Sequence, residues 1–131
     1  MAEHPNAEVL RAGYVAFANS DIDSLREKYF DPNIVWHTTG HNRLAGDFRG
    51  VDAVMESFGR LMQESDGTFK TDVHDIVAND EHAVALCSFS ASHGGKSITD
   101  RYTHVTHIEN GKMTESWIFG ENQDKVDAFW G

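Results

Sequence analysis

Cysteine, long apolar runs and basic residues are all scarce in this sequence. One cysteine in 131 residues cannot form an internal disulfide. No apolar run approaches the roughly 18 residues that a membrane-spanning helix needs, and the amino terminus has no basic segment followed by an apolar one. Basic residues number 11 against 21 acidic ones, for a formal charge of -10. Because this charge repels nucleic-acid phosphates and anionic lipid, we expect no nucleic-acid or membrane partner. The scarcity of apolar segments leads us to expect a cytoplasmic protein.

What the sequence does contain is sufficient for one folded domain. Hydrophobic residues make up 40% of the chain and aromatic residues 11%, so we expect a single domain over residues 1–131 with one core. Cys87 lies in an apolar run and is expected to be a buried thiol. Histidine is abundant, with eight residues. Acid–base and metal chemistry near neutral pH both favour this residue.

Helical spacing dominates the first half of the chain. Leu10, Tyr14 and Phe17 are spaced i, i+4 and i+7, which predicts an amphipathic helix over residues 6–18 with Asn6 as its N-cap. Asp21 can cap a short helix over residues 22–29, which ends before the Asp-Pro-Asn at 31–33. A longer helix is predicted from residue 51 to a stop near 66–67, and a last helical turn over residues 124–130.

A period of two replaces the helical period in the second half. Strands are predicted over residues 34–38, 69–77, 82–92, 98–108 and 112–119, with a short extended piece at 47–49 inside a loop. Three short turns separate the last four strands: Asn79-Asp80-Glu81, Gly94-Gly95 and Asn110-Gly111. Consecutive hairpins that follow the helices predict an α+β protein with an antiparallel sheet.

This order of elements resembles the nuclear transport factor 2-like superfamily and, within it, the SnoaL-like and ketosteroid isomerase-like proteins. The resemblance covers essentially the whole chain. It rests on these strings: Tyr14-Val15-Ala16, Ile34-Val35-Trp36-His37-Thr38-Thr39-Gly40, Ala45-Gly46-Asp47-Phe48-Arg49-Gly50 and Phe119-Gly120-Glu121-Asn122. It implies a conical, curved antiparallel sheet with the N-terminal helices on its concave face, a cystatin-like α+β barrel. It also implies an apolar pocket at the mouth of the cone and a homodimer that pairs through the sheets.

The resemblance also assigns three candidate catalytic residues. Tyr14 takes the position of the oxyanion tyrosine of the isomerase-like proteins, and His104 that of the second oxyanion donor. His37 takes the position of the base, where ketosteroid isomerases have an aspartate. A neutral imidazole is a competent base near neutral pH, so His37 is expected to take a proton from a carbon next to a carbonyl, or to activate a water.

Further residues are expected at the substrate pocket. Alternation along a strand places Trp117 on one face with Phe119, and Tyr102 on one face with His104. The expected substrate-binding residues are Trp36, Phe58, Tyr102, Trp117, Phe119, Glu121 and Asn122. Their alternative role is in the core, with polar groups hydrogen-bonded internally. Asp100 and Arg101 are interpreted as a solvated pair, because the acid-arginine-acid pattern of limonene epoxide hydrolases is not reproduced.

The sequence predicts no cofactor and no metal site, in spite of its histidines. His104 and His107 are three residues apart, so they lie on opposite faces of a strand and cannot chelate one ion together. His82 and His93 fall near turns, where solvated histidines are common. The leading hypothesis is therefore a cofactor-independent isomerase- or polyketide-cyclase-like enzyme acting on a small apolar carbonyl or polycyclic compound. The alternatives are a non-catalytic protein that binds a hydrophobic ligand and a dimeric assembly module.

Overall fold

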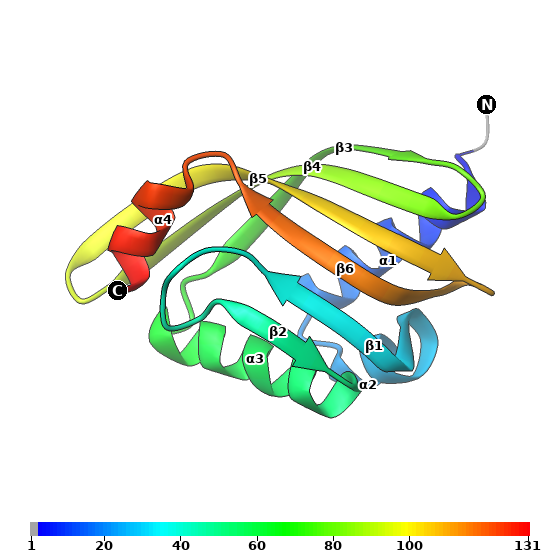
Figure 1. Cartoon of the computed structure of the whole chain (residues 1–131), viewed down its shortest axis with the longest axis horizontal. Coiled ribbons are helices and arrows are strands. Elements are labelled where there is room, and N and C mark those ends of the chain that lie inside the picture. The colour runs from blue at the N-terminus through cyan, green and yellow to red at the C-terminus, as the bar shows by residue number, and fades with distance from the viewer. Residues whose placement is uncertain (1–2) are drawn as a thin grey trace.

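Six strands form one twisted sheet, and the helices lie against one of its faces (Figure 1). The computed structural model describes residues 3–131. The helical segments are α1 (Pro5–Ala18), α2 (Ile22–Ser24), the π-helix η1 (Leu25–Tyr29), α3 (Val51–Glu64) and α4 (Gln123–Trp130). The strands are β1 (Phe30–Thr38), β2 (Gly46–Arg49), β3 (Lys70–Ala78), β4 (His82–His93), β5 (Lys96–Glu109) and β6 (Lys112–Gly120). Among these residues no helix has both the length and the apolar character needed to cross a membrane.

The sheet is mixed, which corrects the prediction of a wholly antiparallel sheet. Its strand order is β2-β1-β6-β5-β4-β3, and β1 pairs with β6 in parallel while every other pair is antiparallel. Hairpin turns fix only the strands that they join, and β1 and β6 are separated by most of the chain. A long connection permits parallel pairing, so local turn signals could not reveal this contact. The α+β class is confirmed.

The N-cap of α1 is not the residue that the sequence predicted. Pro5 occupies the first turn, where its missing N–H is not needed. His4 is the N-cap, and its Nδ1 accepts a hydrogen bond of 3.1 Å from the Asn6 amide, so Asn6 lies inside the helix. The prediction for Asp21 is confirmed, since its carboxylate accepts a hydrogen bond from the Ser24 amide at the start of α2.

Strand β1 begins four residues earlier than predicted and passes through Pro32. The pairing of β1 with β6 is irregular between Phe30 and Val35, and Pro32 lies within that interruption. A proline has no N–H to give to the ladder, so within sheets it is confined to such irregular places or to edges. The three predicted turns are confirmed as connections between β3, β4, β5 and β6. Asn110 and Gly111 have φ values of 52° and 76°, as a type I′ turn requires.

The core lies between the inner face of the sheet and the helices. Its largest fully buried apolar side chains come from α1, η1, β1, α3 and β6: Leu10, Leu25, Ile34, Val54 and Met113. Each such side chain contributes about 1.5–3 kcal/mol when it leaves water. Cys87 is also buried, as predicted. In the described part of the chain, the helices contact only the inner face, so the outer face of the sheet has no cover of its own (Figure 1).

The loop between β1 and β2 fastens the C-terminal helix α4. Asn42 Nδ2 donates a 2.7 Å hydrogen bond to Asp127 Oδ1, and Arg43 donates two hydrogen bonds to the Trp130 carbonyl. Gly40 lies under the same helix with a φ of +117°. A Cβ atom at this position would collide with the side-chain amide of Gln123 and lie 2.5 Å from Asp127 Oδ1.

We therefore expect Gly40→Ala to destabilise the protein and to loosen α4. The strained φ costs about 1–3 kcal/mol, and relieving the collision displaces the Gln123 and Asp127 side chains from their hydrogen bonds. Gly59→Ala is the matched control, because Gly59 is inside α3 and a Cβ atom at this position would have no atom within 4 Å. This change should stabilise the protein by about 0.5–1 kcal/mol. Urea denaturation measures both changes, and equal effects of the two substitutions would contradict the proposed role of Gly40.

Candidate functional site

A cavity of about 160 Å³ lies between the inner face of the sheet and helices α1, α3 and α4. Aromatic and aliphatic side chains from all of these elements form most of its wall; they include Leu10, Phe17, Phe30, Trp36, Phe58 and Phe89. An engineered cavity of about 150 Å³ in another protein holds a benzene molecule. The cavity therefore has room for about one ring, and a polycyclic ligand would have to extend beyond it.

Three polar side chains meet at the wall of this cavity. Tyr102 Oη donates to Tyr14 Oη at 3.0 Å, and Tyr14 Oη lies 2.9 Å from His104 Nδ1. Tyr14 comes from α1 because its helical spacing with Leu10 turns it inward, and alternation along β5 puts Tyr102 and His104 on one face. The structure thus brings Tyr14 and His104 together, as the resemblance implied, and adds Tyr102 to them.

Burial keeps this Tyr14–Tyr102–His104 cluster uncharged. It raises the pKa of Tyr14 and of Tyr102 well above the usual value, and it lowers the pKa of His104 to about 3. None of the Asp, Glu, Lys and Arg side chains described by the structure lines the cavity. Near neutral pH the cluster can therefore give and accept hydrogen bonds, but it presents no ionic charge to a ligand.

The second ring nitrogen of His104 is not satisfied. His104 is 1% exposed, and its Nε2 has no hydrogen-bond partner among residues 3–131. The imidazole packs beside the Trp36 indole, with 4.8 Å between ring centroids. A buried polar atom without a partner costs about 1–3 kcal/mol, and most buried polar atoms in native proteins are paired. His104 therefore carries an unpaired polar atom beside the cavity, within the part of the chain that the structure describes.

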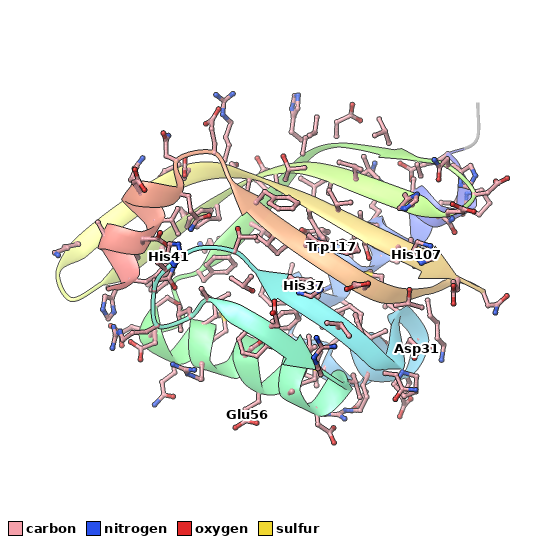
Figure 2. All side chains as sticks on the ribbon, in the orientation of Figure 1. Asp31, His37, His41, Glu56, His107 and Trp117 are labelled. Carbon is pink, nitrogen blue, oxygen red and sulfur yellow. The ribbon has the colours of Figure 1, made fainter. Side chains whose placement is uncertain are left out.

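His37 lies on the opposite face of the sheet, which corrects its expected place in the pocket. Its Nδ1 is 2.6 Å from Asp47 Oδ1 and its Nε2 is 2.6 Å from Glu115 Oε2, and its ring stacks on Trp117 (Figure 2). Partial burial lowers the pKa of His37, but the hydrogen bonds to the two carboxylates outweigh this effect and leave the pKa raised. Neighbouring strand residues face opposite sides, so Trp36 and Thr38 point into the cavity while His37 points away.

Trp117 and Phe119 are also outside the cavity. Trp117 is paired with His37 across β1 and β6 and shares its outer face, and Phe119 is 46% exposed. Ile118, between them, lines the cavity. The expectation that Trp117 and Phe119 form the cavity wall is therefore wrong. The reason is the same as for His37: neighbouring strand residues face opposite sides, and these two residues of β6 face outward. Trp36, Phe58 and Tyr102 do line the cavity.

Glu121 and Asn122 fasten the end of β6 to β5 and do not line the cavity. Arg101 donates two hydrogen bonds, of 2.9 and 2.6 Å, to the Glu121 carboxylate at the surface. The backbone N–H and side-chain amide of Asn122 both donate to the Asp100 carboxylate. Asp100 is 5% exposed, so its interpretation as a solvated residue is wrong, whereas Arg101 is exposed.

Sequence reasoning missed the polar residues that line the cavity near α4. Asn42 comes from the β1–β2 loop, Ser57 from α3 and Gln123 from the first turn of α4. The sequence predicted a helical turn over residues 124–130 but not the segment against which it packs. Hydrogen bonds from Asn42 and Arg43 to α4 and to the Gly131 carbonyl join the loop and the C-terminal segment.

We expect His104 to titrate far below an ordinary histidine. Because its folded pKa is about 3 and the reference value is 6.5, the unfolded chain takes up this proton first as the pH falls. His104 therefore lowers the free energy of unfolding progressively between about pH 6.5 and pH 3 and has no effect above that range. Imidazole NMR signals followed against pH test this. His37 is the internal control and should titrate above 6.5; a midpoint near 6.5 for His104 would contradict its burial.

Comparison with known proteins agrees with this architecture. The model of the SnoaL-like domain family matches residues 10–116. The solved structure of Bal32a, from a soil-derived mobile gene cassette, is 34% identical, with 97% of each chain covered and a TM-score of 0.92. A protein from Xanthomonas campestris with a cystatin-like fold is 27% identical, with 96% of this chain and 98% of that chain covered and a TM-score of 0.87.

A proposed SnoaL-like polyketide cyclase from Jannaschia sp. CCS1 has the same fold, with a TM-score of 0.79, 12% identity, and 98% of this chain and 94% of that chain covered. At that identity the likeness concerns the fold alone. The cystatin-like α+β fold expected from the sequence is confirmed. The family match extends over most of the chain, from α1 through β6, and so includes all three residues of the polar cluster. The chain belongs to the SnoaL-like domain family.

Proposed function

We propose that the cavity binds a neutral, mostly apolar carbonyl compound of about one ring, with the carbonyl oxygen at the Tyr14 hydroxyl. The observation that supports this most directly is the uncharged Tyr14–Tyr102–His104 cluster in the wall of an otherwise largely apolar cavity. An ionic ligand would lose its hydration there and gain no opposite charge. A carbonyl oxygen, in contrast, needs only a hydrogen-bond donor.

The cluster is arranged to strengthen the Tyr14 hydroxyl as a donor. Tyr102 donates to Tyr14 Oη, and His104 donates to the same oxygen when its proton is on Nδ1. With both oxygen lone pairs occupied, the Tyr14 hydrogen is left for the ligand. Hydrogen bonds in such a chain polarise one another, and the effect is greater where water is excluded. Tyr14 would then stabilise negative charge on a ligand oxygen, as the oxyanion donors of isomerases do.

This arrangement supports the oxyanion part of an isomerase- or cyclase-type reaction. Such a reaction also needs a base. His37 is on the other face of the sheet, and His104, with a pKa of about 3, is a weak base. The proton acceptor is therefore assigned to a bound water or to the ligand itself. The second candidate function is binding without reaction, and it is favoured by the lack of a carboxylate among the described residues that line the cavity.

Two probes of the same shape test the binding mode. Acetophenone and α-methylstyrene differ in one group, a carbonyl in the first and an alkene in the second. The wild type should prefer acetophenone by about fivefold in Kd, and Tyr14→Phe should abolish that preference, because one hydrogen bond contributes about 1 kcal/mol net. His37→Ala, on the outer face, should leave it unchanged. Titration calorimetry measures the constants, and an undiminished preference in Tyr14→Phe would contradict the proposal.

Hydrogen exchange at the carbon next to the carbonyl separates catalysis from binding. An enzyme that stabilises the enolate speeds the uptake of deuterium from D₂O into bound acetophenone, and Tyr14→Phe slows it. NMR detects the exchange directly. Saturable binding with exchange at the rate of free acetophenone would assign the cavity to the second candidate function.

We also propose that the uncovered outer face pairs two copies of the chain. Two cross-strand rows on β4, β5 and β6 are mainly apolar: Val84, Val105 and Trp117, then Leu86, Thr103 and Phe119. Leu86 and Phe119 are 42% and 46% exposed in the single chain. Contiguous exposed apolar surface of this kind is typical of a protein–protein interface. A second copy would cover it with the same surface, as two-fold symmetry requires.

Phe119→Asp should convert the proposed dimer into a monomer. A carboxylate at this position would have to lose its hydration against an apolar partner surface. Val15→Asp is the matched control, because Val15 is equally apolar and 56% exposed but lies on α1, away from the outer face. Light scattering after size-exclusion chromatography gives the mass of each variant. A wild-type protein that is monomeric at all concentrations tested would rule out the pairing.

A further inference from the structure

A histidine and carboxylate cluster lies on the outer face, where β4 begins and β5 ends. Glu81, His82 and His107 each offer a ligand atom within 4.8 Å of those of the other two. His82 and His107 are direct cross-strand partners. From this geometry we infer that Glu81, His82 and His107 form a binding site for a transition-metal dication of the zinc type. The inference does not rest on the function proposed for the cavity, because the site and the cavity are on opposite faces of the sheet. The site lies on the same face as the proposed pairing surface, separated by one cross-strand pair from Val84 and Val105.

The two imidazole rings are close enough to bind one ion. Their centroids are 5.1 Å apart, with an interplanar angle of 77°. A tetrahedral zinc ion with Zn–N bonds of about 2.0–2.1 Å needs ligand atoms about 3.4 Å apart. The ligand atoms therefore have to approach by about 1.4 Å at most. The Glu81 side chain is exposed at a turn and is free to contribute to this movement. Figure 2 shows His107 near the end of β5.

The backbone under this site is held in place from both sides. Asn79 Oδ1 accepts hydrogen bonds from the backbone N–H groups of Glu81 and His82, at 2.9 and 2.8 Å. The Glu81 carbonyl accepts a 2.9 Å hydrogen bond from the Ile108 amide, next to His107. The backbones of the three ligand residues, from two segments of the chain, are thus fixed relative to one another before any metal binds, which lowers the entropy cost of binding.

Thr114 orients the His107 ring. The Thr114 hydroxyl lies 3.2 Å from the His107 carbonyl oxygen and 3.1 Å from His107 Nδ1. When the hydroxyl gives its hydrogen to the carbonyl oxygen, it accepts from Nδ1–H, and the lone pair on Nε2 is left for the metal. A second hydrogen bond of this kind, which orients a histidine and leaves one nitrogen for the metal, is the usual outer-shell arrangement in metal sites.

The ligand set selects the metal. Two imidazoles and one carboxylate suit zinc, copper and nickel, whereas magnesium and calcium prefer oxygen ligands alone. Three protein ligands leave a fourth position for water. The formal charge of -10 further favours cation binding. The predicted solvated role of His82 does not account for this pairing, which spacing along the chain could not show because the two histidines belong to different strands.

Zinc titration by calorimetry, on tag-free protein freed of metal with a chelator, tests the site. We expect one Zn²⁺ per chain, and a loss of affinity of roughly tenfold or more in His82→Ala and in His107→Ala. The matched control is the double variant His41→Ala/His74→Ala, which removes two exposed histidines elsewhere and should bind as the wild type does. Thr114→Val should weaken binding although every ligand remains.

Two further measurements keep the result decisive. Circular dichroism checks that each variant is folded. If a histidine variant does not fold, Glu81→Gln is used in its place, because Glu81 is at an exposed position. Cobalt(II) substitution should give the visible absorption of a tetrahedral site in the wild type and lose it in His107→Ala. If zinc binding is not saturable, or if the site variants bind as tightly as the control, the assignment is overturned.

Discussion

The helices of residues 3–131 cover one face of the sheet, and this cover decides which strand side chains are buried. On β5 every second residue from Ile98 to Ile108 is buried while its neighbours face outward, and on β1 and β6 irregular pairing interrupts the same pattern. One protein therefore carries two surfaces with different chemistry. The cavity wall on the inner side is largely apolar and has only uncharged polar groups among the described residues, whereas the outer surface carries histidines and carboxylates beside apolar side chains.

The same constraint explains the contrast between His37 and His104. Both are strand histidines, but His104 is enclosed and its pKa falls to about 3, whereas His37 sits between two carboxylates and its pKa is raised. Desolvation acts on both residues, and the difference comes from the partners. Among residues 3–131, the His104 ring has one hydrogen-bond partner, the neutral Tyr14 hydroxyl. Environment, rather than residue type, thus divides the histidines into a neutral member of the cavity wall and a surface ion-pair residue.

Much of the fold could be predicted because its signals are local. The turn at Asn110-Gly111 needs two residues with positive φ, and the helical spacing of Leu10, Tyr14 and Phe17 is enough to turn Tyr14 inward. The cap at His4 was missed, since an imidazole is an uncommon helix cap and Asn6 offered a more familiar one. The candidate site was predicted less well. A string resemblance placed His37 correctly along the chain but on the wrong face, because neighbouring residues of a strand differ by half a turn.

The sequence by itself determined the α+β class, most element boundaries to within a few residues, and the inward positions of Tyr14 and His104. These depend on periodicity, turn geometry and short-range sterics, which act between residues close in the chain. Only the tertiary structure decided the parallel pairing of β1 with β6, the cover of α4 by the β1–β2 loop and the meeting of His82 with His107. Those contacts join residues far apart in sequence, and their free energy depends on the packing of the whole sheet.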